Sequence, residues 1–424
     1  MRLQMCVRLS YLRFKLPSRN RIWLVLTLCW VGFGASPWAF AIENGLAATP
    51  PMGWNSWNAF HLAIDEGKIR AMADYIASSG MKDAGYEYVV VDAGWKAKTR
   101  DAPGRLVADP AKFPSGMKAL ADYIHSKGLK FGIYTDAGSE DCDSGAPGSK
   151  DHEEIDAQTF AEWGVDYVKE DWCYSEGLDA RTAYGKMSRA IHATGRPMVF
   201  SLCEWGDNQP WLWAAAVGNL WRTTGDGKNC WDCGGETAAK KGGYPRGWTR
   251  ILDAQVGLEK YAGPGHWNDP DLLLVGLPGL TAEETRAHFS LWAILAAPLI
   301  ASCDLSSMPP AIEEILKNKD VIGIDQDALG KEGTRVSHAG QYEVWVRHLK
   351  GGGRAIVLFN RSSHATKMSL TPEQAELPGF GSVHALDVWT GRELHALKGR
   401  YSMRVSPHGA AMIRIESMPK DSSK

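Results

Sequence analysis

The segment Val165–Cys173 has the sequence VDYVKEDWC. It begins with residues typical of a strand and continues into three charged residues at 169–171. Successive side chains of a strand point to opposite faces, so Lys169 and Asp171 share one face and Glu170 lies on the other. If Lys169 and Asp171 face the inside of a barrel, Glu170 faces the surrounding helices or the rim. A cation two residues away favours the ionised form of Asp171, which a nucleophile requires. Asp171 is therefore the leading candidate for a catalytic residue, and the alternative is a structural Lys–Asp pair.

Short β-rich segments recur along the chain and alternate with amphipathic ones. The expected strands are Met52–Trp57, Tyr86–Asp92, Leu129–Tyr134, Asp166–Asp171, Met198–Glu204, Leu220–Arg222, His266–Asp269 and Pro298–Cys303. The amphipathic stretches between them include Gly67–Ser79, Met117–Lys127, His152–Trp163, Ala180–Ala193 and Ala282–Ala296. Several of these strands are apolar on both faces, as a buried parallel sheet requires. The alternation predicts an α/β fold, a (β/α)8 TIM barrel over residues 42–330.

From about residue 331 the pattern changes to short strands separated by turns, without a helical segment between them. The expected strands there are Tyr342–Val346, Arg354–Phe359, Ser382–Val388 and Met412–Ile415. Turn residues such as Gly351–Gly353 and Pro407–Gly409 separate them. This pattern predicts a C-terminal antiparallel β-sandwich over residues 331–424, with a polar, frayed tail from Met418.

The first residues have the features of an export signal. A basic segment without acids precedes the apolar run Ile22–Phe33, and Ala39-Phe40-Ala41 offers a cleavage site. The run is short for a bilayer span, so a signal peptide over residues 1–41 is favoured over an uncleaved anchor. Cleavage would change the formal charge from −2 to −8, because six basic residues and no acidic ones would leave. An exported, mildly acidic mature chain without a basic stripe is not expected to bind nucleic acid or a membrane surface.

Six cysteines remain after residue 41, namely Cys142, Cys173, Cys203, Cys230, Cys233 and Cys303. Export permits disulfides. The CWDC segment Cys230–Cys233 favours a local disulfide, with free thiols as the alternative. Zinc is disfavoured because no second ligand pair follows nearby in the sequence.

Polar residues gather at the ends of the expected strands, where the active site of such a barrel forms. They are Asp92, Tyr134, Asp136, Lys169, Asp171, Glu204, Arg222, Asp269, Asp271 and Asp304. A second acid, Asp226, follows the sixth strand in the segment WRTTGD, whose loop-like end is expected to hold the carboxyl group away from cations. The alternative for Asp226 alone is a turn-forming residue after glycine. Two carboxylates at the ends of different strands are what hydrolysis of a glycosidic bond requires.

Tryptophans also lie at or beside strand ends, at positions 54, 57, 95 and 205. A tryptophan in a barrel is more often part of the core, but acids surround Trp57 and Trp205, so these two are expected to line a sugar site. Arg222 and Glu204 can offer hydrogen bonds to neighbouring hydroxyls. The reaction needs no metal, and the sequence has no glycine-rich phosphate loop, so no cofactor is implied.

Together these segments resemble glycoside hydrolase family 27, the α-galactosidase and α-N-acetylgalactosaminidase family, over nearly the whole mature length. The similar segments are Thr49–Trp57 (TPPMGWNSW), Gly132–Gly138 (GIYTDAG), Cys203–Asp207 (CEWGD), Trp221–Asp226 (WRTTGD) and Trp267–Asp271 (WNDPD). The resemblance implies a retaining double displacement, with Asp171 as nucleophile and Asp226 as acid/base. It also implies sugar-hydroxyl contacts from Asp92, Lys169, Glu204, Arg222 and Asp271, pocket walls from Trp57 and Tyr134, and a Cys142–Cys173 disulfide beside the nucleophile.

The sequence departs from the family pattern after Asp92. A second Asp and then a Cys usually follow, whereas Ala93 and Gly94 stand here. In the family that second acid helps to hold the axial and primary hydroxyls of galactose. Further departures are Glu170, Trp172 and Leu272, and no cysteine lies between Trp57 and Ala93.

The leading hypothesis is a secreted exo-acting α-galactosidase that releases terminal α-D-galactosyl residues from small or polymeric galactosides. Ala93 motivates a rival, a β-L-arabinopyranosidase, because arabinopyranose lacks the hydroxymethyl group. An α-N-acetylgalactosaminidase is less favoured, because Trp205 occupies space that an acetamido group needs. A different class, a sugar-binding protein without catalysis, is disfavoured because both acids are present.

Overall fold

The computed structural model describes residues 44–234, 246–379, 383–396 and 399–417. The expected signal peptide, residues 1–41, and the tail from Met418 lie outside the described residues.

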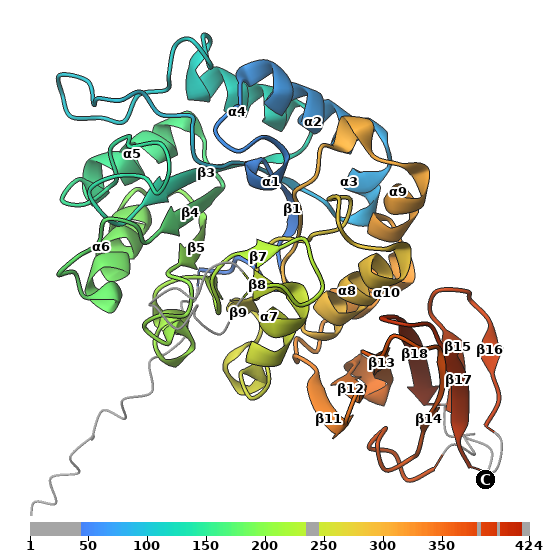
Figure 1. The fold of residues 1–424 in the computed structure, drawn as a ribbon. Coiled ribbons are helices and arrows are strands. Elements are labelled where there is room, and N and C mark those ends of the chain that lie inside the picture. The colour runs from blue at the N-terminus through green and yellow to red at the C-terminus, as the bar shows by residue number, and fades with distance from the viewer. Residues whose placement is uncertain (1–43, 235–245, 380–382, 397–398, 418–424) are drawn as a thin grey trace, which may run out of the picture. The chain divides into compact units, whose positions relative to one another are not determined.

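A parallel eight-stranded sheet surrounds the interior of the larger part of the chain (Figure 1). Its strands are β1 (Met52–Asn55), β2 (Tyr88–Val91), β3 (Lys130–Asp136), β4 (Tyr167–Asp171), β5 (Val199–Cys203), β6 (Leu220–Arg222), β9 (Trp267–Asp269) and β10 (Leu299–Ala301). They pair in the order β10-β1-β2-β3-β4-β5-β6-β9. A parallel bridge from Leu273, just after β9, to Ala301 of β10 connects the two ends of the sheet. All eight expected strands are therefore present, and the predicted TIM barrel is confirmed.

Helices cover the outside of the barrel (Figure 1). They are α1 (Trp57–Phe60), α2 (Glu66–Ser78), α3 (Met81–Ala84), α4 (Gly116–Ser126), α5 (Glu153–Trp163), α6 (Ala180–Ala193), α7 (Trp248–Ala254), α8 (Ala282–Ile294), α9 (Pro310–Leu316) and α10 (Lys319–Asp325). The expected strand Met52–Trp57 ends two residues early, because Trp57 begins α1. A capping box between Thr281 and Glu284 fixes the start of α8. At Gly53 a Cβ would lie 2.4 Å from the carbonyl oxygen of Tyr88, so glycine is needed for the close pairing of β1 and β2.

The C-terminal part is antiparallel, as predicted. Its strands are β11 (Thr334–Ala339), β12 (Tyr342–His348), β13 (Arg354–Asn360), β14 (Thr366–Leu370), β15 (Val383–Asp387), β16 (Glu393–Leu394), β17 (Tyr401–Val405) and β18 (Ala410–Ser417). Six of them form one sheet in the order β11-β12-β13-β18-β15-β16, and β14 pairs with β17. Apolar side chains from both sheets, such as Ile356, Leu358 and Leu370, share one core. This part is the predicted β-sandwich.

Strand β13 explains why the sandwich packs on the barrel. Its residues Ile356 and Leu358 belong to the sandwich core, whereas the alternate residues Val357 and Phe359 belong to the core of the barrel. A strand buried on both faces needs this continuous apolar run. The buried Arg347 adds polar contacts, because its guanidinium donates to the carbonyls of Ala293 and Asp325 at 2.6 and 2.9 Å.

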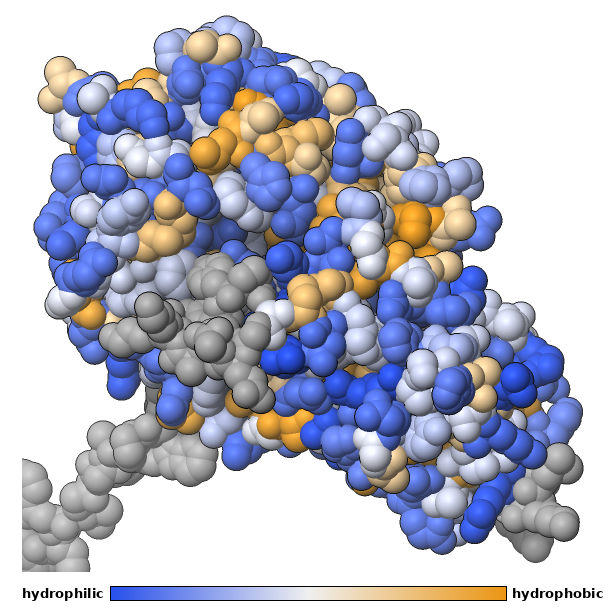
Figure 2. All heavy atoms as spheres, viewed as in Figure 1, coloured by the Kyte–Doolittle hydropathy of each residue, from blue (hydrophilic) through white to orange (hydrophobic). Residues whose placement is uncertain are grey.

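On the face drawn in Figure 2, hydrophilic residues cover most of the surface and hydrophobic ones occur in smaller groups. None of the described helices is both long and apolar enough to cross a membrane.

Two further short strands lie between β6 and α7. They are β7 (Gly227–Lys228) and β8 (Arg246–Gly247), which pair in parallel. They flank the disulfide between Cys230 and Cys233, so the local disulfide is present and the free-thiol alternative is wrong. Among the described cysteines, Cys203 and Cys303 are free and buried.

Candidate active site

Asp171 ends strand β4 and is almost buried, with 7% of its surface exposed. Lys169 lies two residues earlier, but its ammonium pairs with Asp92 at 2.8 Å and not with Asp171. The alternative of a structural Lys169–Asp171 pair is therefore wrong. Burial raises the pKa of Asp171 to about 6, while Lys169 acts in the opposite direction and Asp226 adds to the rise. Lys169 favours the ionised form as expected, but the effect of burial is larger.

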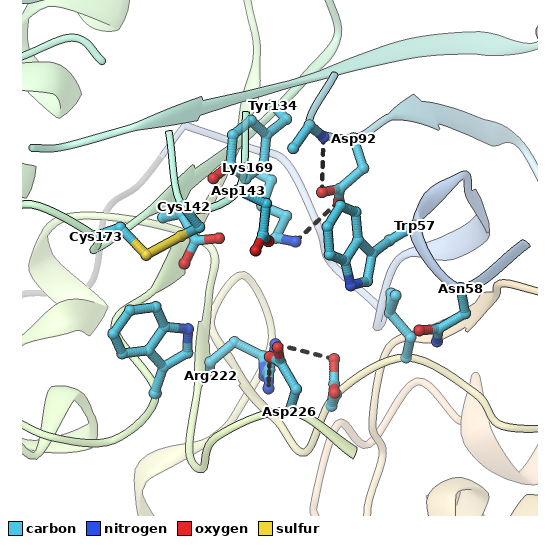
Figure 3. Close-up of a pocket in the computed structure, with 15 residues that line it drawn as sticks. Trp57, Asn58, Asp92, Tyr134, Cys142, Asp143, Lys169, Cys173, Arg222 and Asp226 are labelled. Carbon is cyan, nitrogen blue, oxygen red and sulfur yellow. Dashed lines mark hydrogen bonds and ion pairs between the residues drawn. A yellow bond between two sulfur atoms is a disulfide. The ribbon is translucent and has the colours of Figure 1, made fainter. Parts of the chain in front are cut away.

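Asp226 lies in the loop between β6 and β7, with 37% of its side chain exposed. The expectation that this loop keeps the carboxyl group away from cations is wrong. The Arg222 guanidinium donates to Asp226 Oδ1 at 2.9 Å, because the turn brings residue 226 back to the end of β6. The same guanidinium pairs with Asp271 at 2.9 Å, so one buried arginine holds two carboxylates (Figure 3).

Asp271 follows β9 and is held from two sides. Its Oδ2 accepts the backbone N–H of Gly227 at 2.6 Å, and Arg222 binds its Oδ1. Its backbone has a φ of 92°, an unusual value for a residue other than glycine. Burial raises the pKa of Asp271 to about 6, against the opposing charge of Arg222. Arg222 therefore holds the carboxylates of Asp226 and Asp271 in place on one side of the site.

Asp92 follows β2 and accepts three hydrogen bonds from the protein. Its Oδ2 accepts from the side chains of Asn55 and Lys169 at 2.7 and 2.8 Å, and its Oδ1 accepts from the N–H of Ala93 at 2.9 Å. A carboxylate has about four acceptor positions, so roughly one remains for a ligand. Asp92 and Lys169 form the wall opposite Arg222 and Asp226 (Figure 3).

These side chains surround a cavity of about 210 Å³ at the carboxyl ends of the strands. It is smaller than the roughly 300–1,000 Å³ of pockets that hold drug-sized ligands, so it suits a single small ring. The lining residues are Trp57, Asn58, Asp92, Ala93, Tyr134, Cys142, Asp143, Lys169, Asp171, Cys173, Trp205, Arg222, Asp226, Asp271 and Leu272. Every residue predicted to act in catalysis or to contact the sugar is among them except Glu204, whereas the further strand-end acids Asp136, Asp269 and Asp304 do not line the cavity.

Glu204 is fully buried behind the cavity wall. Its Oε2 accepts from the backbone N–H and the side chain of Asn208 at 2.6 and 2.7 Å. Burial raises the pKa of Glu204 to about 7, and the hydrogen bonds from Asn208 oppose this rise. Glu204 is not among the residues that line the cavity, and its Oε1 has no hydrogen-bond partner among the described residues.

Of the four tryptophans near strand ends, Trp57 and Trp205 line the cavity, whereas Trp54 and Trp95 are fully buried in the barrel core. The sequence reasoning did not single out Asn58 or Asp143, which also line the cavity. For Asp143 the available signal was its position directly after Cys142, a residue that the family resemblance already placed beside the nucleophile.

A disulfide joins Cys142 and Cys173, on the loops that follow β3 and β4. Among the described residues, Asp136, Cys142 and Cys173 have potential ligand atoms within 4.8 Å of one another. Both sulfurs are bonded to each other, however, so neither is a thiolate that could bind a metal ion.

Glu170 lies on the opposite face of β4, as the strand alternation predicts, and is fully buried. Neither of its carboxylate oxygens has a hydrogen-bond partner among the described residues. Burial, with a further contribution from Asp136, raises the pKa of Glu170 well above its usual value. Burial therefore favours the protonated form of this side chain, which lies on the opposite face of β4 from Asp171.

Comparison with known proteins identifies both parts of the chain. The family described as "Alpha galactosidase A" matches residues 49–327, and "Alpha galactosidase C-terminal beta sandwich domain" matches residues 339–415. The α-galactosidase A of Cellvibrio japonicus is 47% identical over 381 residues, which cover 87% of this chain and 92% of that protein. The α-galactosidase of Cyamopsis tetragonoloba is 43% identical over 373 residues, 88% of this chain and 87% of that one. The crystal structure of α-galactosidase I from Mortierella vinacea matches with a TM-score of 0.86 at 36% identity, covering 90% of this chain and all of that one.

Proposed function

Since the chain belongs to the α-galactosidase family, glycoside hydrolase family 27, we propose that it hydrolyses terminal α-D-galactosyl residues by a retaining double displacement at Asp171 and Asp226. The chain is an α-galactosidase of this family, and the assignment of individual residues is the proposal. The main observation in support is that two carboxylates, the buried Asp171 and the partly exposed Asp226, line the same cavity, which has the size of one sugar ring.

In the first step, an oxygen of Asp171 attacks the anomeric carbon while Asp226 transfers its proton to the glycosidic oxygen. The bond to the leaving group breaks and a galactosyl–Asp171 ester forms. In the second step, Asp226 takes a proton from water, whose oxygen attacks the anomeric carbon and releases Asp171. Burial suits Asp171, because a weakly solvated carboxylate is more reactive. Exposure suits Asp226, because its proton must reach the leaving group and later return from water.

The remaining lining groups support binding of one galactosyl ring. Asp92, Lys169 and Arg222 can bind hydroxyls, and Trp57, Tyr134 and Trp205 form the apolar walls. Glu204 is not included in this binding set, because its carboxylate is buried against Asn208.

Sugar preference tests the proposed substrate, because Ala93 leaves a wall position without a carboxylate. We expect the mature chain to hydrolyse nitrophenyl α-galactoside with a higher kcat/KM than nitrophenyl β-L-arabinopyranoside. The Ala93→Asp variant adds an acceptor at that wall and should increase the preference for the galactoside. A wild-type preference for the arabinoside would overturn the galactoside assignment while leaving the mechanism intact.

The pH dependence of the reaction follows from Asp171. A nucleophile must be ionised, and burial raises the pKa of Asp171 to about 6, so kcat/KM should fall about tenfold per pH unit below that value. Because Asp226 contributes to the rise, Asp226→Asn should move this acidic limb to lower pH. The measurement is the pH profile of kcat/KM on an activated aryl α-galactoside, which needs little acid assistance. If the acidic limb of the variant lies at the same pH as that of the wild type, the ionisation of Asp171 does not determine this limb.

We further propose that the chain is exported, and that residues 42–330 and 331–424 are its catalytic and sandwich domains. The basic and apolar leader before residue 42 and the two disulfides support export.

A further inference from the structure

Asp143 differs from the other carboxylates of the cavity. Five aspartates line it, at positions 92, 143, 171, 226 and 271. Four of them accept a hydrogen bond or an ion pair from the protein: the partners of Asp92, Asp226 and Asp271 are described above, and Asp171 Oδ1 accepts the backbone N–H of Trp172 at 3.1 Å. Asp143 is exposed, and the described residues offer it no such partner. It is therefore the one lining carboxylate in the described structure whose acceptor positions all remain available to a ligand.

The backbone around Asp143 is firmly held. Cys142, just before it, is linked to Cys173 beside the catalytic strand. Asp141 forms a buried ion pair with Lys96 at 2.6 Å and accepts from the Ser144 hydroxyl at 2.9 Å. The Asp143 side chain is thus presented from a short loop fixed on both sides. A preorganised acceptor of this kind loses little conformational entropy when it binds a ligand.

Asp143 lines the cavity and is also exposed to solvent, which places it at the cavity mouth. Partial burial raises the pKa of Asp143, and among the neighbouring charges Asp226 has the largest effect, followed by Asp92. Asp226 is the half-exposed acid, whose proton must meet the glycosidic oxygen. His61 has the opposite effect and lowers the pKa of Asp143. It is exposed, and the centroid of its ring lies 5.0 Å from that of Trp57. Exposure and nearness to Asp226 are what a contact with the leaving group requires, while Asp92 and Lys169 of the galactosyl site also act on the Asp143 carboxyl group.

A cavity of about 210 Å³ has room for one galactosyl ring, so the leaving group of a bound galactoside would extend beyond it. We infer that Asp143 forms a leaving-group subsite at the cavity mouth, where it accepts hydrogen bonds from the hydroxyls of a sugar or other polyol. This inference rests on the proposed function, since it assigns a binding residue to the leaving group of the same galactoside substrate. A carboxylate can accept from two neighbouring hydroxyls at once, whereas an aryl leaving group offers it none.

The test compares two substrates with the same galactosyl group. One is α-galactosyl-(1→6)-glucose, and the other is nitrophenyl α-galactoside. For Asp143→Ala we expect the ratio of their kcat/KM values, disaccharide over aryl, to fall tenfold or more, the scale of a lost hydrogen bond to a charged group. Asp143→Asn keeps an acceptor oxygen without the charge and should give an intermediate ratio. The ratio is informative because kcat/KM reports the first chemical step for both substrates.

Asp122→Ala is the matched control, because Asp122 is an exposed aspartate on α4 with 60% of its side chain accessible. It should retain both kcat/KM values of the wild type. An Asp143→Ala ratio within about twofold of the wild type would overturn the inference, whether both substrates lose activity or neither does. Equal losses would assign Asp143 to the galactosyl ring instead. Failure of the proposed function is distinguishable, because the wild type would then cleave neither substrate.

Discussion

Asp171→Ala should abolish hydrolysis of every α-galactoside, with kcat/KM lowered about 10⁴-fold or more, the scale seen when a catalytic nucleophile is removed. The physical reason is that the ester bond forms at the Asp171 carboxylate, and the protein already holds two of the other lining carboxylates. Asp92 is engaged by Asn55 and Lys169, and Asp271 by Arg222 and Gly227. The measurement is steady-state hydrolysis of nitrophenyl α-galactoside by the variant and the wild type under the same conditions.

Folding and chemical rescue separate loss of the nucleophile from loss of structure. The folded-state pKa of Asp171 is raised from 3.8 to about 6, so the fold loses stability as pH rises between these two values and stays less stable above pH 6. At pH 7 the variant should therefore unfold at a temperature close to or above that of the wild type. Azide can enter the space left by the carboxylate and attack the anomeric carbon directly, which should restore turnover and give the inverted β-galactosyl azide. A folded variant with substantial unaided activity would contradict the assignment of Asp171.

The fold was predictable because its periodicities are local. Each of the eight barrel strands is a short apolar run, and the end of each strand could be read to within about two or three residues. Strand β4 shows the strength of this reasoning, because alternation alone placed Lys169 and Asp171 inside and Glu170 outside. The alternation did not predict that the Glu170 carboxyl group is buried without a hydrogen-bond partner among the described residues, because that depends on the side chains packed around it.

The parts of the site that the sequence did not predict depend on three-dimensional contacts. Arg222 reaches Asp226 because the chain turns back after β6, and a linear reading of the WRTTGD segment has no sign of that turn. Glu204 carries a family motif but faces Asn208. The sequence reasoning did not single out Asp143, which lines the cavity next to the disulfide-bonded Cys142. Residue type and strand position therefore predict which groups gather, but not how their charges pair.

Asp226→Ala should lower kcat/KM on α-galactosyl-(1→6)-glucose by about 10²–10⁴-fold, the usual contribution of a general acid. On an aryl galactoside with two nitro groups, the first step should be nearly unaffected, since that leaving group departs without a proton. The second step then becomes slow, because Asp226 also activates water. The result should be a burst of nitrophenolate followed by slow turnover, observed by stopped-flow absorbance.

The alternative role for Asp226 is structural, as the partner that positions Arg222 beside Asp271. In that case its removal would impair both steps and both substrates to the same extent, because the disturbed guanidinium contacts the galactosyl site and not the leaving group. Asp226→Asn distinguishes the two roles, since it retains an acceptor for Arg222 but cannot exchange a proton. If Asp226 is the acid/base, Asn and Ala should behave alike, and azide should accelerate both variants by attacking the galactosyl–Asp171 ester. Because the ester has the inverted configuration, that second attack gives the α-galactosyl azide, opposite to the product expected from Asp171→Ala.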